Sequence, residues 1–377
     1  QLTQKLAALR DDHLERRRGL LESPQGVRIR IDGRELLSFC SNDYLGLAAS
    51  PELIHAGHAA LDACGVGSGA SHLISGHHAA HHAFETNFAE FVRKPAALLF
   101  SSGYMANLGV LSALMGRHGE VFADRLNHAS LNDAAQLCGA KFTRYQHADL
   151  SQLEAQLARS VAKTKMIVSD LVFSMDGDIA PVDALLDLAE RHDAWLYLDD
   201  AHGFGVLNAG RGGMTERAAR SDRVIYLATL GKAAGVAGAA VAAEQTVIAW
   251  LIQKSRPYIY TTAMPPMLAA CLLASLQAIA EGDALRQRLR QHVDQLRAGI
   301  ARLRWKLLPS ETPIQPLIVG DNASAMELSV TLRERGILVP AIRTPTVPQG
   351  SARLRITLSA AHTAEDVQQL IAALHEI

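Results

Sequence analysis

Lys232 lies in the stretch LATLGKAAGVAG (227–238), where small, mostly apolar residues surround a single charged side chain. Burying a lysine as a cation is costly, and desolvation favours the neutral amine, which can attack a carbonyl carbon. The glycines of this stretch leave room for a flat ring close to the backbone. A surface lysine that extends its amine into water is the alternative interpretation.

Asp199 and His202 belong to the stretch YLDDAHG (197–203), which ends an apolar run. A carboxylate at this position can pair with the protonated nitrogen of a pyridine ring, and the cationic ring is then a better electron sink. A structural acid that caps a turn is the alternative. The pattern therefore indicates a ring-shaped cofactor that carries a basic nitrogen.

Gly103 and Tyr104 open a predicted helix after a predicted strand. The free N–H groups at the start of a helix bind phosphate, and Thr229 adds a hydroxyl group near Lys232. Together these residues indicate pyridoxal 5'-phosphate (PLP), with Lys232 as its covalent attachment point. The chain has no GxGxxG after its first strand and no GxxxxGK[ST], which disfavours dinucleotide and P-loop sites.

Seven short apolar stretches, separated mostly by helical patterns, predict a largely parallel sheet covered on both faces. They span residues 97–102, 120–124, 141–145, 165–172, 195–200, 223–230 and 238–244. Ligands of such sheets bind beyond the carboxyl ends of the strands. Five polar loops follow predicted strands, at residues 100–107, 124–130, 173–178, 199–205 and 229–232. One such loop could hold ordinary turn residues, but five favour a ligand site.

The two ends of the chain carry different patterns. Residues 27–39 alternate like a hairpin with Asp32-Gly33 as its turn, and residues 264–303 form a long helical pattern broken near 281–283. Strands are predicted at 314–319, 337–342 and 353–358, before a last helix that opens with a capping box, Thr363 to Asp366. We expect three parts: an N-terminal helix and hairpin (1–43), a large PLP-binding domain (44–282) and a C-terminal α+β domain (283–377).

The composition of the 377-residue chain is that of a globular protein, with 49% hydrophobic and 20% charged residues. Its formal net charge of −1 gives no indication of general nucleic-acid or anionic-membrane binding. No apolar run reaches membrane-spanning length, and residues 1–20 form a charged amphipathic pattern without the apolar core of a signal peptide. The four scattered cysteines form no CxxC pair, which predicts reduced thiols in a cytoplasmic protein.

Nine stretches, in order along the whole chain, resemble the α-oxoamine synthases, a family of fold-type I PLP enzymes. They are SNDYLGL (41–47), GSGASHLISG (67–76), GYMAN (103–107), NHAS (127–130), FSMDGD (173–178), DDAHGFG (199–205), TLGK (229–232), TTAMPP (261–266) and ARLRITLSAAH (352–362). The resemblance implies an α/β fold with a mainly parallel seven-stranded sheet between helices, a smaller C-terminal α+β domain and an N-terminal helix and hairpin. It also implies a homodimer with its active site at the interface.

Residues 314–322 and 342–358 most resemble the family member of biotin biosynthesis. That member condenses L-alanine with a pimeloyl thioester, carried by coenzyme A or by an acyl carrier protein. Another α-oxoamine synthase that uses a different amino acid, such as glycine, is one alternative, and a catalytically silent relative that serves as a binding module is another.

The resemblance assigns roles to the cofactor residues. Lys232 binds PLP and later takes the Cα proton of the amino acid, and Asp199 pairs with the pyridine nitrogen. His128 stacks on the ring and helps to position the substrate. His202 hydrogen-bonds the phenolic oxygen of the ring. The remaining cofactor contacts are Gly103, Tyr104, Ser174, Thr229 and, from the other subunit, Thr262.

The resemblance also assigns substrate contacts. Asn42 and an arginine of the stretch RLRIT hold the carboxylate of the amino acid. Arg353 and Arg355 share one face of the predicted strand, so the sequence does not separate them, and we prefer Arg355. Thr357 lines the same channel. Arg16 is a candidate for the far carboxylate of the acyl substrate, with a solvated helix face over the run 16–18 as the alternative.

Four histidines near residue 80 are unusual for the family. His78 and His82 are four residues apart, as are His77 and His81, so each pair would share one face of a helix. A metal site could use this spacing, and Glu85 lies one turn further on. We favour instead a helix start near the dimer interface with hydrogen-bonded or exposed histidines, and predict no metal ligand.

Overall fold

The computed structural model describes residues 1–11, 14–16 and 18–377, which form two compact units. Unit 1 comprises residues 1–46, 175–177 and 287–377, and unit 2 comprises residues 47–174 and 178–286. The three-part division of the chain given above stays a prediction. The two units are described one at a time.

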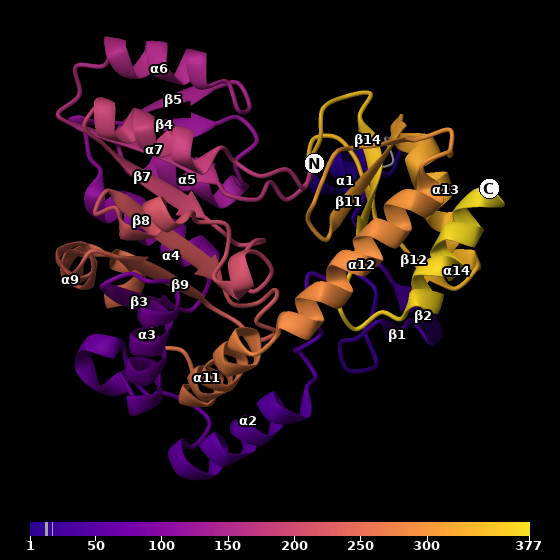
Figure 1. Cartoon of the computed structure of the whole chain (residues 1–377), viewed down its shortest axis with the longest axis horizontal. Coiled ribbons are helices and arrows are strands. Elements are labelled where there is room, and N and C mark those ends of the chain that lie inside the picture. The colour runs from indigo at the N-terminus through magenta and orange to yellow at the C-terminus, as the bar shows by residue number, and fades with distance from the viewer. Residues whose placement is uncertain (12–13, 17) are drawn as a thin grey trace. The chain divides into compact units, whose positions relative to one another are not determined.

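Unit 2 is built on a seven-stranded sheet with the strand order β3-β9-β8-β7-β6-β4-β5 (Figure 1). Its strands are β3 Ala96–Phe100, β4 Gly119–Asp124, β5 Lys141–Tyr145, β6 Thr164–Asp170, β7 Ala194–Asp199, β8 Val224–Thr229 and β9 Ala239–Ala243. All seven predicted strands are confirmed. The sheet is mainly parallel, as predicted, because β9 alone among these described strands runs antiparallel to its neighbours β3 and β8.

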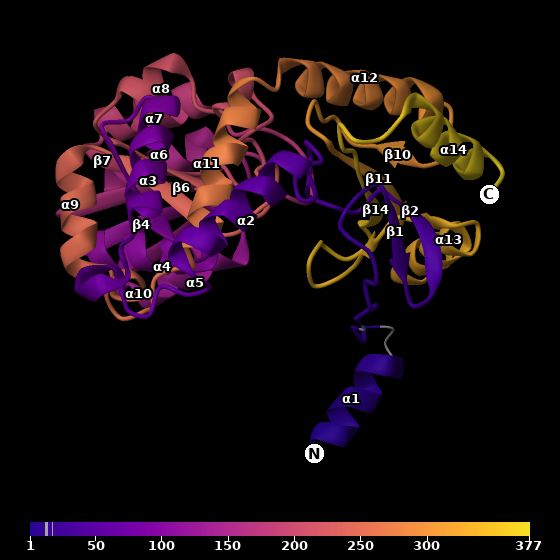
Figure 2. The same ribbon diagram turned by 90° about the horizontal axis from the view of Figure 1, so that it is seen from below.

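Helices cover both faces of this sheet, with α6, α7 and α8 on one side and α4, α5 and α10 on the other (Figure 2). The helices of unit 2 are α2 Pro51–Cys64, α3 Ala79–Phe91, α4 Gly103–Leu114, α5 Ala129–Leu137, α6 Leu150–Arg159, α7 Val182–Arg191, α8 Glu216–Arg220, α9 Gln245–Lys254, α10 Arg256–Ile259 and α11 Pro266–Ala280. In β6, Met166 and Val168 pack into the core cluster that includes α4 and α5, while Ile167 between them is equally buried. A strand buried on both faces is a continuous apolar run, and this pattern makes the central strands of the sheet predictable from the sequence.

Unit 1 contains two small sheets, with the strand orders β1-β2-β12 and β10-β11-β14-β13. Its strands are β1 Arg28–Ile31, β2 Arg34–Ser38, β10 Lys306–Leu307, β11 Ile314–Gly320, β12 Ile337–Leu338, β13 Ala341–Ile342 and β14 Ala352–Thr357. The helices are α1 Leu2–Asp11, α12 Asp283–Ile300, α13 Asn322–Glu334 and α14 Ala364–His375, with α12 starting at the end of unit 2. Strand β12 pairs with β2, so residues from both ends of the chain share one sheet.

The local patterns predicted for unit 1 are largely confirmed. The hairpin turns at Asp32 and Gly33, which have φ values of 52° and 74°, and the capping box at Thr363 and Asp366 is present. The single strand predicted at 337–342 is wrong, because it is divided into β12 and β13. Pro340 lies between the two strands, and a proline has no N–H to donate to a ladder.

By length and composition, no single described helix could cross a membrane, and only the bent pair α11 and α12 passes that test when taken together.

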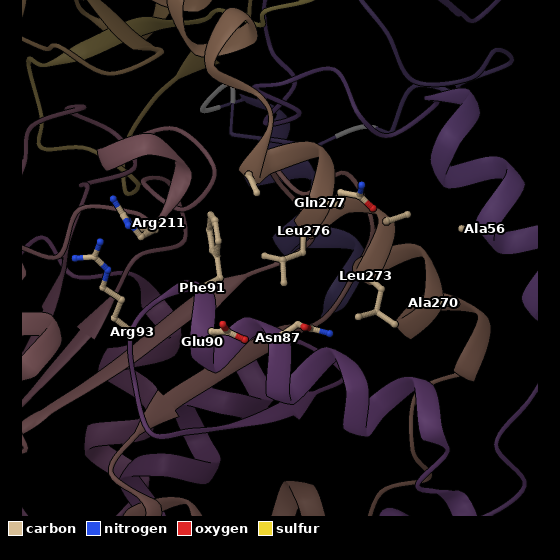
Figure 3. A pocket seen from close by; sticks show the side chains of 12 residues that line it. Ala56, Asn87, Glu90, Phe91, Arg93, Arg211, Ala270, Leu273, Leu276 and Gln277 are labelled. Atoms are coloured by element: carbon tan, nitrogen blue, oxygen red, sulfur yellow. The ribbon is translucent and has the colours of Figure 1, made fainter.

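A cavity of about 790 Å³ lies on unit 2 beside α3 and α11 (Figure 3). Phe91 of α3 and Leu273 and Leu276 of α11 give it an apolar wall, and Arg93 and Arg211 stand at one side. None of the residues that line it is among the predicted site residues. Cavity size alone therefore does not indicate where the chemistry of this protein takes place.

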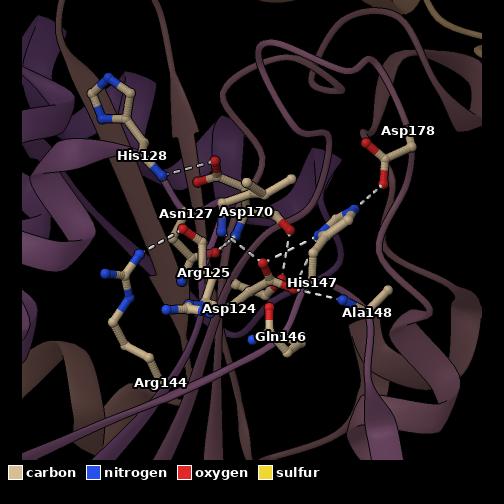
Figure 4. Close-up of polar contacts among 12 residues, drawn as sticks. Asp124, Arg125, Asn127, His128, Arg144, Gln146, His147, Ala148, Asp170 and Asp178 are labelled. Atoms are coloured by element: carbon tan, nitrogen blue, oxygen red, sulfur yellow. Dashed lines mark hydrogen bonds and ion pairs between the residues drawn. The ribbon is translucent and has the colours of Figure 1, made fainter. Parts of the chain in front are cut away.

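His147 links the loop after β5 to two carboxylates of unit 2 (Figure 4). Its Nδ1 is 3.1 Å from Oδ1 of Asp124, at the end of β4, and its Nε2 is 2.8 Å from Oδ2 of Asp178. Burial lowers the pKa of His147, but the hydrogen bonds and charges of the two carboxylates outweigh it and raise the pKa to about 10. His147 is therefore a cation at neutral pH and joins two of the loops that follow the sheet.

We expect the stability contributed by His147 to depend on pH. The pKa of the folded state is above the ordinary value of 6.5, so the contribution is complete below about pH 6.5 and is lost as the pH rises toward 10. His147→Gln should lower the melting temperature most at pH 6 and least at pH 10. Thermal unfolding of both proteins over this range measures the difference. A difference that grows with pH would contradict the prediction.

Candidate active site

Lys232 lies in the turn after β8, and its Nζ is 3.0 Å from Nε2 of His202. The N–H of Gly235 donates to the carbonyl of Lys232 and closes the turn at 2.8 Å. Gly235 has a φ of 69°, and a Cβ there would lie 2.6 Å from the backbone nitrogen of Ala48, so this close approach requires glycine. Lys232 is half-buried and His202 is buried. The amine thus lies beside a buried imidazole. This contact disfavours the alternative of a surface lysine that extends its amine into water.

Asp199 is the last residue of β7, and only 4% of its surface is exposed. Its Oδ2 accepts a hydrogen bond from Nδ2 of Asn107 at 2.8 Å, and its Oδ1 accepts one from the N–H of Ala201 at 3.1 Å. Asn107 is held in turn by the hydroxyl of Tyr197, which donates to its Oδ1 at 2.6 Å. The carboxylate is therefore fixed in one orientation at the carboxyl end of the sheet.

His128 precedes α5, and its backbone N–H donates to Oδ2 of Asp170 at 3.0 Å (Figure 4). Its Nδ1 is 2.7 Å from Oγ of Ser130, which also accepts a hydrogen bond from Nδ2 of Asn107 at 2.9 Å. Through Ser130, the amide of Asn107 joins His128 to Asp199. The residue as a whole is exposed, so the network orients a side chain that a ligand can still reach.

Gly103 and Tyr104 open α4 after Ser102, whose hydroxyl caps the helix by accepting from the N–H of Met105 at 3.2 Å. A Cβ on Gly103 would lie 2.5 Å from Cγ2 of Thr229, so only glycine fits against the end of β8. The start of α4 therefore lies directly beside the Thr229 side chain. A helix start with a small residue and a neighbouring hydroxyl group suits an anion such as phosphate.

Ser174 and Thr262 complete the predicted residues of unit 2. Ser174 is half-buried after β6, and Thr262 is exposed and forms an antiparallel bridge with Ser71. Their predicted contacts with a cofactor stay predictions.

In unit 1, three of the predicted substrate residues lie together. Arg355 is 6% exposed, and its Nη1 donates to Oδ1 of Asn42 at 3.2 Å and to Oγ1 of Thr357 at 2.9 Å. The hydroxyl of Tyr44 donates to the same amide oxygen at 3.2 Å. These contacts fix the orientation of the guanidinium group and therefore of its N–H donors. Paired hydrogen bonds to a carboxylate require such a fixed orientation.

Arg353 differs from Arg355 in its partners. Its Nη1 forms an ion pair with Asp176 and also donates to the carbonyl of Met175 at 3.2 Å. This arginine holds the segment 175–177 within unit 1, which favours Arg355 as the substrate clamp. Arg16 is exposed, and Arg17 of the same run lies outside the described residues.

Asn107 and Ser130 were missed as site residues, although both belong to stretches that carry the family resemblance. Their importance depends on contacts with residues far away in the sequence, 92 positions in the case of Asn107 and Asp199. One signal was present in the sequence: Asn107 is the only amide in the mostly apolar stretch GYMANLGVLSAL (103–114). The structure shows that this amide is fully buried, and such a group requires hydrogen-bond partners.

The arrangement in unit 2 fits PLP. It offers an amine on Lys232 for the aldehyde, a buried carboxylate on Asp199 for the pyridine nitrogen, and the start of α4 for the phosphate. His128 adds an oriented imidazole that can pack on a ring. These parts come from the ends of four strands, as the predicted position of the ligand requires.

Comparisons with known proteins agree with this assignment. The family model of aminotransferase class I and II matches residues 34–374. The 8-amino-7-oxononanoate synthase of Thiobacillus denitrificans is 68% identical over 378 residues, which cover 100% of this chain and 98% of that protein.

Two solved structures are also similar. A serine palmitoyltransferase variant from S. paucimobilis with a bound PLP–myriocin aldimine has a TM-score of 0.94 at 27% identity, over 100% of this chain and 96% of that one. An 8-amino-7-oxononanoate synthase from Francisella tularensis has a TM-score of 0.79 at 33% identity, over 90% and 97% of the two chains. The chain therefore belongs to the PLP-dependent aminotransferase class I and II family, and to its α-oxoamine synthase branch together with the 8-amino-7-oxononanoate synthases.

Proposed function

We propose that the protein catalyses the decarboxylative condensation of L-alanine with a pimeloyl thioester in biotin biosynthesis. The products are 8-amino-7-oxononanoate, CO₂ and the free thiol of the carrier. The observation that carries this proposal is the 68% identity, over the whole chain, to an enzyme named for that product. The amine, carboxylate and imidazole of unit 2 supply the groups that such a reaction needs.

When bound, PLP supplies a ring that takes up the negative charge left on the α-carbon of the amino acid. Asp199 would hold the ring nitrogen, and Asn107 and Ala201 hold Asp199 in place. Lys232 binds the cofactor in the resting enzyme and takes the Cα proton of the substrate on its Nζ. The Nε2 of His202, at 3.0 Å, orients that amine. A base placed in this way typically accelerates proton transfer by about 10²- to 10⁴-fold.

The carboxylate of alanine is assigned to Arg355 and Asn42, which are hydrogen-bonded to each other in unit 1. Thr357 orients the same guanidinium group. We assign Thr357 to the lining of the substrate channel. Arg16 is assigned to the far carboxylate of the pimeloyl group. The carrier of that group is either coenzyme A or an acyl carrier protein.

We further propose that the enzyme is a cytoplasmic homodimer with its active site at the interface. The exposed position of Thr262 suits a contact with the cofactor phosphate of the other subunit. All four cysteines are free thiols, which suits a reducing compartment.

A substrate panel tests the reaction. Purified holoenzyme receives L-alanine, glycine or L-serine with pimeloyl, acetyl or palmitoyl thioesters, and CO₂ and free thiol are measured. We expect L-alanine with the pimeloyl thioester to give the highest kcat/KM and both products in equal amounts. Faster turnover of glycine or serine would assign the protein to another α-oxoamine synthase activity. No turnover of any pair would support the catalytically silent alternative.

Lys232→Ala should still bind PLP but lose turnover by at least about 10²-fold, because the phosphate and ring contacts remain while the base is removed. Borohydride reduction of the wild-type holoenzyme should label the peptide that contains residue 232. Peptide mapping and absorbance spectra measure both effects. A label on another lysine, or turnover near the wild-type rate in the variant, would refute the role of Lys232.

Arg355→Lys should raise the KM for alanine by about 10- to 100-fold, because a lysine cannot form the paired hydrogen bonds of a guanidinium group with a carboxylate. The matched control is Arg353→Lys, which keeps a cation beside Asp176 and should change this KM little. Steady-state kinetics with varied alanine measure both variants. The reverse pattern would assign the carboxylate clamp to Arg353.

A further inference from the structure

A group of metal-ligand side chains in unit 2 has no part in the proposed reaction. His77 precedes α3, while His82 and Glu85 lie one turn apart on that helix. One ligand atom from each of the three lies within 4.8 Å of the others, and Nε2 of His77 is 3.9 Å from Oε2 of Glu85. Neither helix pair expected in the sequence, His77 with His81 or His78 with His82, lies wholly on α3, because the helix begins only at Ala79. The fold instead brings together the side chains of His77, His82 and Glu85.

His81 is not a suitable ligand, although it lies beside this group. Its Nδ1 accepts a hydrogen bond from the N–H of His78 at 3.0 Å, and its Nε2 is 2.8 Å from the carbonyl oxygen of Met264. Both ring nitrogens therefore have backbone partners, and binding an ion would require breaking one of these bonds. Within the described part of the chain, two groups of side chains could bind a metal ion. We favour the group of His77, His82 and Glu85 over the group of His72, His77 and His81.

His72 orients His77. The Nδ1 atoms of the two rings are 2.9 Å apart, so one of them donates a hydrogen bond to the other. When His77 is the donor, its Nε2 keeps a lone pair on the side of Glu85. The ring of His72 is stacked on Tyr258, with 4.7 Å between the centroids and 10° between the planes. A second partner that fixes the tautomer of a ligating histidine is typical of metal sites.

Glu85 supplies a carboxylate with one oxygen directed into the group. Its side chain is 12% exposed, and its Oε1 accepts from the N–H of Leu99 at 2.8 Å. Over residues 1–11, 14–16 and 18–377, His77 is the only basic residue with a nitrogen within 4.0 Å of its carboxylate. A largely buried carboxylate of this kind is stabilised by a cation. A cavity of about 590 Å³ lined by His72, His77, His82 and Glu85 gives an ion access.

We propose that His77, His82 and Glu85 bind a divalent transition-metal ion of the Zn²⁺ class, with water in the remaining position and His72 as a positioning residue. Two imidazoles and one carboxylate are a donor set that Zn²⁺ accepts, whereas Mg²⁺ and Ca²⁺ prefer oxygen ligands alone. The ion would join the segment before α3 to the helix itself. This proposal departs from the expectation that the histidine group binds no metal.

Calorimetric titration of the PLP-loaded protein with zinc chloride tests this site. We expect one Zn²⁺ per chain and a higher melting temperature in its presence. His82→Ala should weaken binding at least about 10-fold, because it removes a direct ligand. The side chain of His82 is exposed, so the variant should fold. The matched control is His78→Ala, which removes a neighbouring histidine outside the ligand set and should bind like the wild type.

Two further variants separate ligand from positioning roles. Glu85→Gln keeps an oxygen for the N–H of Leu99 but loses the charge, and should bind Zn²⁺ at least about 10-fold more weakly. His72→Phe keeps a ring on Tyr258 but loses the partner of His77, and should weaken binding about 10- to 100-fold. Absence of Zn²⁺ binding by the wild type, or equal affinity in His82→Ala, would overturn the site. Because binding is measured without substrates, this outcome is independent of the substrate panel.

Discussion

The buried carboxylate of Asp199 is the group on which the rest of the candidate site depends. A carboxylate removed from water is costly unless other donors replace its hydration. Asn107 provides one donor from α4 and Ala201 provides another from the turn after β7. Tyr197 then fixes the amide, so the orientation of the acid follows from the packing of a helix on the sheet. A PLP enzyme needs this acid in one place, because its charge decides how strongly the ring attracts electrons.

The side-chain amide of Asn107 also constrains the positions of α4 and α5 relative to the sheet. Asn107 donates to both Asp199 and Ser130, and Ser130 in turn contacts the imidazole of His128. A shift of either helix would therefore change the acid and the imidazole together. Gly103 adds a second constraint, since any side chain there would collide with Thr229. The start of α4, where we propose that a phosphate binds, is thus tied to the end of β8, where the turn that carries Lys232 begins.

Much of this could be predicted from the sequence, for a physical reason. Strands buried on both faces must be apolar throughout, and the polar residues of a site must follow them, so both patterns are local. The contacts of Asn107 and Ser130 are not local, because they join segments that the sequence separates widely. The ion pair between Arg353 and Asp176 could not be predicted from the sequence either, since it depends on where Asp176 lies in the folded unit. A single proline divided the strand predicted at 337–342.

Asp199 and Glu85 show two ways of keeping a carboxylate out of water. Asp199 has a hydrogen-bond donor for each carboxylate oxygen, Asn107 for one and the backbone N–H of Ala201 for the other. Glu85 has a backbone donor on Oε1, while its Oε2 faces an imidazole at a distance too long for a hydrogen bond. Burial accordingly raises the pKa of Glu85 to about 8, with the bond from Leu99 opposing it. Because α3 begins only at Ala79, His77 approaches Glu85 from the segment before the helix, while His82 approaches it from the helix itself.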